Sequence, residues 1–153
     1  MRILFICHGN ICRSPMAEYI MKELVKREGV AGDWEIESAA VSSEEIGNPV
    51  YPPAKRELAK HGISCEGKRA VQLQKADYDK YDYLIGMEER NRRNMLRILG
   101  GDLEGKVSLL LDYAERHGDI ADPWYTGDFT TTYSDIVRGC EGFLTVLGQE
   151  GKQ

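Results

Sequence analysis

Short apolar runs alternate along the chain with longer segments of helical spacing, a pattern typical of α/β proteins. The first run, residues 3–6, precedes a Gly-Asn turn, and apolar residues then recur at helical spacing over residues 16–25. Ser14 is a favoured N-cap residue and Pro15 suits the first helical position, so we expect a helix that starts immediately after Arg13. The first unit is therefore predicted to be strand, loop, helix.

The later segments predict three more strands and three more helices. Residues 34–39 alternate as a second strand, and three prolines within residues 48–53 argue against regular structure before a helix over 54–61. Residues 81–87 predict a third strand, followed by a helix over 88–99 whose arginines face solvent. A fourth strand is expected over 107–111, and residues 132–147 form a long amphipathic pattern.

This order of elements predicts one doubly wound α/β domain over residues 1–153. A central four-stranded parallel sheet with helices on both faces accounts for short, largely apolar strands that alternate with helices. A chain of 153 residues can bury one substantial core without metals or disulfides. In such sheets ligands bind beyond the carboxyl ends of the strands, where the chain passes from Ile6 into Cys7.

Composition excludes several classes of function. The formal net charge is −5 and the basic residues are scattered, which is not the footprint of a nucleic-acid-binding protein. No apolar stretch approaches the roughly 20 residues that span a bilayer, and the first apolar run lacks the length and cleavage site of a signal peptide. The four cysteines are too few and too dispersed for a disulfide framework. We expect a cytoplasmic protein with neither a nucleic-acid nor a membrane partner.

The segment from Cys7 to Ser14 carries the candidate chemistry. Five residues separate Cys7, at the end of a strand, from Arg13, and such a loop can aim its backbone amides at one point near a helix N-terminus. Gly9 permits close approach and Asn10 tolerates positive φ. The same donors favour a thiolate at Cys7, and the planar fork of Arg13 can bind two phosphoryl oxygens at once.

This Cys-x5-Arg-Ser-Pro segment resembles the signature of the low-molecular-weight protein tyrosine phosphatases. The similarity extends to Asp122-Pro123-Trp124-Tyr125, to residues 81–91, to residues 61–63 and to the C-terminal helix, so it covers nearly the whole chain. The resemblance implies that Cys7 attacks phosphorus to form a phosphocysteine and that Asp122 serves as general acid and then as general base. Ser14 is expected to hydrogen-bond the Cys7 sulfur.

The resemblance also implies the remaining site residues and partners. Asn10 and His61 are expected to hold the loop in shape, while Trp124 and Tyr125 flank a phenyl ring. No metal or cofactor is expected. The substrates are phosphotyrosine-containing proteins, the loop binds phosphate-like anions, and a monomer is the default state. The expected phosphate and substrate contacts are His8, Gly9, Asn10, Ile11, Cys12, Ser14, Trp124 and Tyr125.

Two residues depart from the family pattern. Glu44 stands at the mouth of the slot where many members carry an aromatic residue, and His8 replaces the usual aliphatic residue or threonine after the nucleophile. The role of Cys12 stays open between core packing and a reversible disulfide with oxidised Cys7. Cys65 and Cys140 are assigned to the core.

Four other functions compete with tyrosine phosphatase. Arsenate reduction needs further cysteines near the third strand, and residues 77–100 contain none. Phosphoarginine hydrolysis by close relatives goes with threonine at the position of Ile11. A phosphocysteine carrier would lack Arg13 and Asp122. A phosphopeptide-binding module would need neither Asp122 nor a thiolate.

Overall fold

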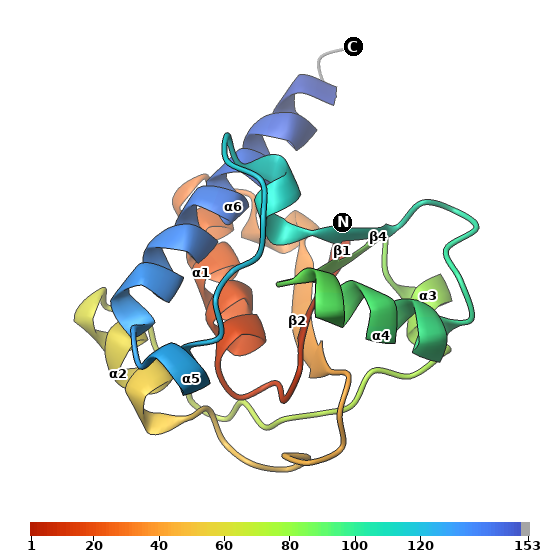
Figure 1. Cartoon of the computed structure of the whole chain (residues 1–153). Helices are drawn as coiled ribbons and strands as arrows, with labels where there is room; N and C mark the ends of the chain where they lie inside the picture. The colour runs from red at the N-terminus through yellow and green to blue at the C-terminus, as the bar shows by residue number, and fades with distance from the viewer. Residues whose placement is uncertain (151–153) are drawn as a thin grey trace.

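The computed structural model describes residues 1–150, with side chains through residue 148. Four parallel strands form one sheet in the order β2-β1-β3-β4 (Figure 1). Their bounds are β1 Arg2–Cys7, β2 Glu35–Ala40, β3 Tyr83–Gly86 and β4 Val107–Leu109. The carboxyl end of β1 lies between those of β2 and β3, with Cys7 paired to Ala40 and Ile6 to Gly86. The predicted four-stranded parallel sheet is confirmed.

Helices cover both faces of the sheet (Figure 1). Side chains of Ile3 and Phe5 on β1 pack in one core with α1 Arg13–Arg27, α2 Pro52–Lys60 and α6 Phe129–Glu150. The alternate residues Leu4 and Ile6 pack on the other face with α4 Glu89–Leu99 and α3 Asp77–Lys80. This alternation follows from the period of two in a strand, so both faces of β1 are buried. No helix within residues 1–150 combines the length and apolar character that a membrane span requires.

The remaining short elements are η1 Ala31–Asp33, η2 Leu110–Tyr113 and α5 Pro123–Thr126. The fourth strand therefore ends two residues before the predicted 107–111 run does, because Leu110 enters the 3-10 turn η2. The last helix begins three residues before the predicted start at residue 132. Helix ends of this kind are the part of a fold that sequence patterns place least well.

Two predicted helix starts are wrong, each for a local reason. Helix α1 begins at Arg13 with Cys12 in the N-cap position, so Ser14 lies inside the helix and does not cap it. Helix α2 begins at Pro52, inside the segment that the prolines were expected to keep irregular. Proline is tolerated in the first helical turn because its missing N–H has no intrahelical partner there.

Candidate active site

The loop between β1 and α1 encloses the sulfur of Cys7. The Ser14 hydroxyl oxygen lies 3.0 Å from Cys7 Sγ, and the backbone amides of Asn10 and Ser14 donate to the same atom at 3.3 and 3.4 Å. Three polar groups, one from the loop and two from the first turn of α1, therefore meet at one buried sulfur. Hydrogen bonds to a charged form stabilise that form, so this surrounding suits a thiolate.

Asn10 holds the loop in this curled shape. Its φ is 60°, the only positive value for a non-glycine residue within residues 1–150. The side-chain amide donates to Ser14 Oγ at 2.8 Å and to Ser38 Oγ on β2 at 2.9 Å, and its carbonyl accepts from the Val71 amide at 3.1 Å. Ser38 in turn donates to the buried carboxylate of Glu18 at 2.6 Å. Every polar atom of the Asn10 side chain thus has a partner, which explains why asparagine occupies this strained position.

Arg13 is fully buried at the start of α1, and its guanidinium faces the pocket. Nη1 donates to Glu88 Oε2 at 3.0 Å and to the Ile120 carbonyl at 2.8 Å, while Nη2 lies 3.4 Å from Asp122 Oδ2. Burial by itself lowers the pKa of Arg13, but the charges of Cys7, Asp122 and Glu88 outweigh it and the net direction is upward. The guanidinium is therefore held charged and in a fixed orientation.

Asp122 reaches the pocket from the turn that opens α5. Its Oδ1 accepts from the Trp124 amide at 3.0 Å and so caps this short helix, which leaves Oδ2 toward Arg13. Aspartate is a preferred N-cap, and Pro123 occupies the first helical position as such a cap favours. The Asp-Pro pair thus sets the direction in which the carboxylate points.

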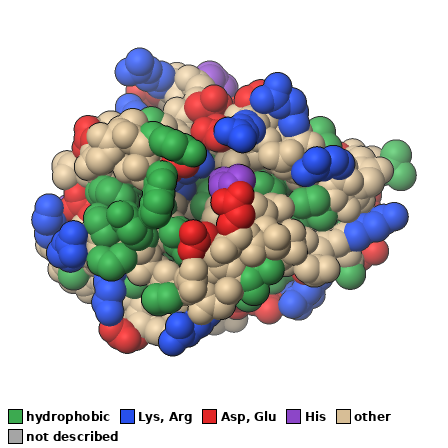
Figure 2. All heavy atoms as spheres, turned by 60° about the horizontal axis from the view of Figure 1, so that its bottom comes forward, with side chains coloured by type: hydrophobic (Ala, Val, Ile, Leu, Met, Phe, Trp, Pro, Cys, Tyr) green, Lys and Arg blue, Asp and Glu red, His purple; other side chains and the backbone are tan. Residues whose placement is uncertain are grey.

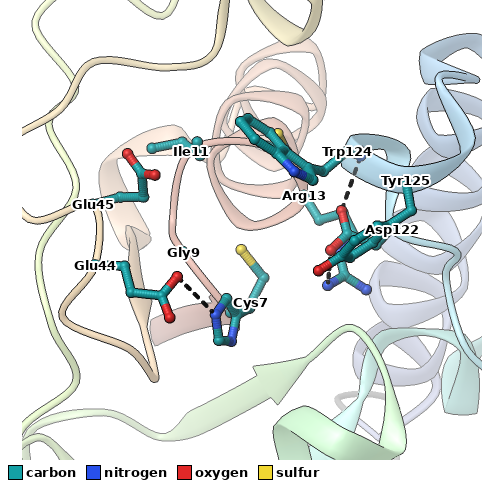
Figure 3. A pocket seen from close by; sticks show the side chains of 11 residues that line it. Cys7, Gly9, Ile11, Arg13, Glu44, Glu45, Asp122, Trp124 and Tyr125 are labelled. Atoms are coloured by element: carbon teal, nitrogen blue, oxygen red, sulfur yellow. Dashed lines mark hydrogen bonds and ion pairs between the residues drawn. The ribbon is translucent and has the colours of Figure 1, made fainter.

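Cys7, Arg13 and Asp122 line one pocket of about 150 Å³, whereas Asn10 and Ser14 lie behind its wall. Figure 3 shows the Cys7 sulfur between Glu44 and Glu45 on one side and Arg13 and Asp122 on the other. The ring of Tyr51 lies 4.7 Å from that of Trp124 and supports the aromatic wall from outside. Figure 2 shows this face of the molecule with acidic and histidine side chains at its centre, beside a hydrophobic patch and ringed by basic side chains. The lining residues are Cys7, His8, Gly9, Ile11, Cys12, Arg13, Glu44, Glu45, Asp122, Trp124 and Tyr125.

Comparison with known proteins places the chain in one family. The model of the low molecular weight phosphotyrosine protein phosphatase family matches residues 2–153, almost the whole chain. The chain belongs to this family.

Three relatives of this family member are informative. The low molecular weight protein-tyrosine-phosphatase YfkJ of Bacillus subtilis is 37% identical over 150 residues, which cover 97% of this chain and 96% of that protein. Its crystal structure superposes with a TM-score of 0.94 over 100% of this chain and 97% of that one. The low molecular weight phosphotyrosine protein phosphatase of Gallus gallus is 41% identical over 147 residues, 93% of this chain and 92% of that protein. A Drosophila arginine phosphatase has a TM-score of 0.88 at 29% identity, with 96% and 98% of the two chains covered.

The two departures from the family pattern meet at the mouth of the pocket. Nε2 of His8 lies 3.4 Å from Oε2 of Glu44, and both side chains are well exposed. Glu45 lies next to them, its carboxylate bonded by the Asn48 side chain, and its stem sits over Gly9.

One residue expected in the site lies elsewhere. The ring of His61 stacks on Tyr133 of α6 at 3.8 Å and lies 3.6 Å from Glu57. His61 therefore joins the end of α2 to α6, and the expectation that it holds the loop in shape is wrong. The contacts expected of it are supplied by Ser38 and Val71, which the sequence analysis did not single out.

Two further site residues have no assignment in the sequence analysis. Glu88, which orients Arg13, lies two residues beyond the end of β3. The carboxyl ends of neighbouring parallel strands meet at one edge, so its position was a usable signal. Glu45 belongs to an irregular loop, and such a loop gives no signal of this kind.

Cys12 lies in the pocket wall, and burial raises the pKa of its thiol, with the charges of Cys7 and Asp122 acting in the same direction. Cys12 is therefore a neutral thiol at neutral pH.

Proposed function

We propose that this chain hydrolyses phosphotyrosine in proteins through a covalent phosphocysteine on Cys7. One observation carries the proposal. Three polar groups of Asn10 and Ser14 meet at Cys7 Sγ, in the same pocket where Arg13 and Asp122 lie 3.4 Å apart. The proposal agrees with the names of the relatives at 37% and 41% identity, both of which are phosphotyrosine phosphatases.

In the first step the phosphoryl group lies on the loop, with its charge balanced by backbone amides and by Arg13. The Cys7 thiolate attacks phosphorus, the S–P bond forms, and the P–O bond to the tyrosyl oxygen breaks. Asp122 gives its proton to that oxygen, because a phenol with a pKa of about 10 is a slow leaving group when it departs as an anion. Arg13 contributes most as negative charge shifts over the equatorial oxygens.

In the second step water replaces tyrosine. The Asp122 carboxylate accepts a proton from a water molecule, the water oxygen attacks phosphorus, and the S–P bond breaks to return the thiolate. The Ser14 hydroxyl, 3.0 Å from the sulfur, stabilises that departing thiolate. Inorganic phosphate leaves, and the site returns to its starting charge.

The walls supply the preference for an aromatic ester. Trp124 and Tyr125 rise from α5 beside Asp122, and Ile11 lies across from them in the lining of the same pocket. A phenyl ring between these side chains gains apolar burial and about 0.5–1.5 kcal/mol of aromatic contact. Phosphoserine has no ring to fill the slot. His8, Gly9 and Cys12 complete the lining and are assigned to phosphate and substrate contact.

The partners follow from the same chemistry. The proposed substrates are proteins that carry phosphotyrosine, and we propose that the chain meets them as a monomer in the cytoplasm. All four cysteines are free and buried, which suits a reducing compartment. Size-exclusion chromatography with light scattering tests the monomer, and fractionation of the source cells tests the compartment.

A side-by-side assay tests the reaction. We expect kcat/KM for a phosphotyrosine peptide to exceed that for matched phosphoserine and phosphoarginine peptides by at least about 100-fold, which is about 2.7 kcal/mol. Arsenate reduction serves as a further comparison, and C7S serves as the inactive control. A preference for phosphoarginine, or thiol-dependent arsenate reduction at comparable rates, would overturn the proposal.

A further inference from the structure

A basic groove lies beside the active-site pocket. It is bounded by the segment between β2 and α2, by the first turn of α2 and by the loop of residues 65–69. Four of its ten lining residues are basic and one is acidic, whereas the whole chain has a net charge of −5. Positive charge is thus concentrated here against the trend of the molecule. The lining residues are Pro49, Val50, Pro52, Lys55, Arg56, Cys65, Glu66, Gly67, Lys68 and Arg69.

Two of the four cations are available to a ligand. Lys68 is turned inward, where Nζ donates to the Ser38 carbonyl at 2.9 Å and lies 3.6 Å from Glu18. Lys55 pairs with Glu66 at 2.9 Å, but both side chains are exposed and such a pair contributes little. Arg56 and Arg69 are exposed, and neither forms an ion pair with a carboxylate of residues 1–148. Arg69 Nη1 donates to the Gly47 carbonyl at 3.2 Å, which orients the side chain but leaves its charge unbalanced, so the groove presents two guanidinium groups without a carboxylate partner.

The floor between these cations is apolar and fixed by backbone pairing. Val50 and Cys65 are buried beneath it. Pro49 pairs with Arg69 in an antiparallel bridge, and the amide of Ala70 donates to the Asn48 carbonyl at 2.9 Å. A surface already held in shape loses little conformational entropy when it binds an extended segment.

One short segment separates the groove from the catalytic pocket. Val50 and Pro52 line the groove, whereas Tyr51 between them turns the other way. The Tyr51 amide donates to the Ile11 carbonyl at 2.8 Å, and its ring lies 4.7 Å from that of Trp124; Ile11 and Trp124 line the catalytic pocket. Residues next to a phosphotyrosine held in the pocket can therefore reach the groove by crossing this one segment.

We propose that the basic groove docks an acidic segment of the substrate protein adjacent to its phosphotyrosine. The inference rests on the proposed phosphatase activity and adds the charge of the preferred substrates. Arg56 and Arg69 match carboxylates by their forked geometry, and their charge steers an acidic segment toward this side of the pocket. Glu45 stands on the stretch of chain that leads into the groove, where its carboxylate accepts from Asn48, so acidic side chains of the substrate are directed to Arg56 and Arg69 and away from Glu45.

The test compares three substrates and two double variants. The substrates are a phosphotyrosine peptide with a run of acidic residues on one side, the same peptide with glutamine and asparagine in that run, and p-nitrophenyl phosphate. Peptides with the run on either side and at several spacings cover the possible registers. The groove variant is R56E/R69E. The matched control is R93E/R97E, which makes the same change in charge on exposed positions of α4, across the sheet from the groove.

We expect wild type to prefer the acidic peptide, and R56E/R69E to lower kcat/KM on it about tenfold, chiefly through KM. Turnover of the neutral peptide and of p-nitrophenyl phosphate stays unchanged, which also shows that the variant folds. Raising the salt concentration removes most of the difference. The control R93E/R97E behaves as wild type.

Three results would overturn the proposal. Equal kcat/KM of wild type on the acidic and neutral peptides would show that there is no preference. If R93E/R97E lost as much kcat/KM on the acidic peptide as R56E/R69E does, the preference would be due to overall charge and not to the groove. Binding of an RNA oligonucleotide that R56E/R69E abolishes, without an effect on the acidic peptide, would assign the groove to nucleic acid. Failure of the phosphatase proposal is distinct, because no phosphotyrosine peptide would then be turned over at all.

Discussion

The floor and the mouth of the catalytic pocket are built in different ways. On the floor, Asn10, Arg13 and Ser14 are at most 1% exposed and each makes several hydrogen bonds. At the mouth, Trp124 is 52% exposed and Tyr125 82% exposed. The bond between Glu44 and His8 joins two exposed side chains. The floor is thus a fixed network, and the mouth is a set of loosely held side chains.

Because of this difference, we expect the floor to govern the chemical steps and the mouth to govern selectivity among substrates. Buried polar groups that satisfy one another resist substitution, because removal of one leaves its partners without hydrogen bonds in a place that water cannot reach. Exposed pairs are screened by solvent, so their exchange has small effects on stability. We therefore expect substitutions on the floor to affect every substrate and substitutions at the mouth to discriminate among substrates.

The largest effect in this comparison is expected for D122A. Loss of the proton donor should lower kcat on phosphotyrosine by about 10²–10⁴-fold. Esters with good leaving groups need less protonation, so their kcat should fall less. The measurement is kcat against leaving-group pKa for a series of aryl phosphates, with D122N as the matched isostere. Equal losses across the series would contradict the role of Asp122 as acid.

The substitution R13K tests the forked contact at the floor. A single ammonium cannot reproduce the bonds to Glu88, the Ile120 carbonyl and the phosphoryl oxygens together. We expect kcat/KM to fall by about 10²–10³-fold on every substrate, since one lost transition-state donor has that effect. Inhibition by phosphate should weaken in parallel. A variant with nearly normal kcat/KM would show that charge alone suffices.

The substitution N10A tests the network itself. It leaves the Ser38 and Ser14 hydroxyls and the Val71 amide short of a partner and places alanine at a φ of 60°. We expect a loss of about 2–4 kcal/mol in the free energy of unfolding, measured in urea. N10G removes the same hydrogen bonds but accepts this φ, so it should recover about 1 kcal/mol. If N10A unfolds within about 0.5 kcal/mol of wild type, the network does not stabilise the loop.

The smallest effect is expected for E44Q at the mouth. The pair with His8 is exposed, so the free energy of unfolding should change by no more than about 0.5 kcal/mol. On a neutral phosphotyrosine peptide kcat/KM should change less than about threefold, while peptides with a basic residue beside the phosphotyrosine should lose more than peptides with an acidic one. A tenfold loss on p-nitrophenyl phosphate would place Glu44 in the chemistry and break the division between floor and mouth.

The sequence predicted the floor well where the residues are contiguous. Cys7, Asn10, Arg13 and Ser14 lie within eight positions, and the loop geometry follows from that spacing and from a strand that enters a helix. The N-cap rule assigned the Ser14 hydroxyl to the helix, but a sulfur at 3.0 Å and the Asn10 amide at 2.8 Å compete for the same oxygen. The local rule failed because the helix already begins at Arg13, and the Ser14 hydroxyl bonds to residues of the preceding loop.

The partners that come from distant segments were harder to predict. Ser38 reaches Asn10 from β2 and Glu88 reaches Arg13 from the end of β3, contacts that depend on strand order and register. Motif similarity also misled at His61, because a matching residue in a sequence does not fix which neighbour it meets in space. The acidic wall of Glu44 and Glu45 belongs to an irregular loop, whose shape no periodicity predicts.

The central claim is that phosphate passes through a covalent bond to the sulfur of Cys7. The most direct test is to quench the enzyme in acid during turnover of a phosphotyrosine peptide and to map the phosphoryl group by mass spectrometry. Our account predicts one phosphoryl group on the peptide that contains Cys7 and none in C7S. In D122N the phosphorylated Cys7 peptide should accumulate with p-nitrophenyl phosphate, because this good leaving group departs without an acid and only the second step is slowed. Turnover with no phosphorylated Cys7 peptide, or with the phosphoryl group on another residue, would contradict the account.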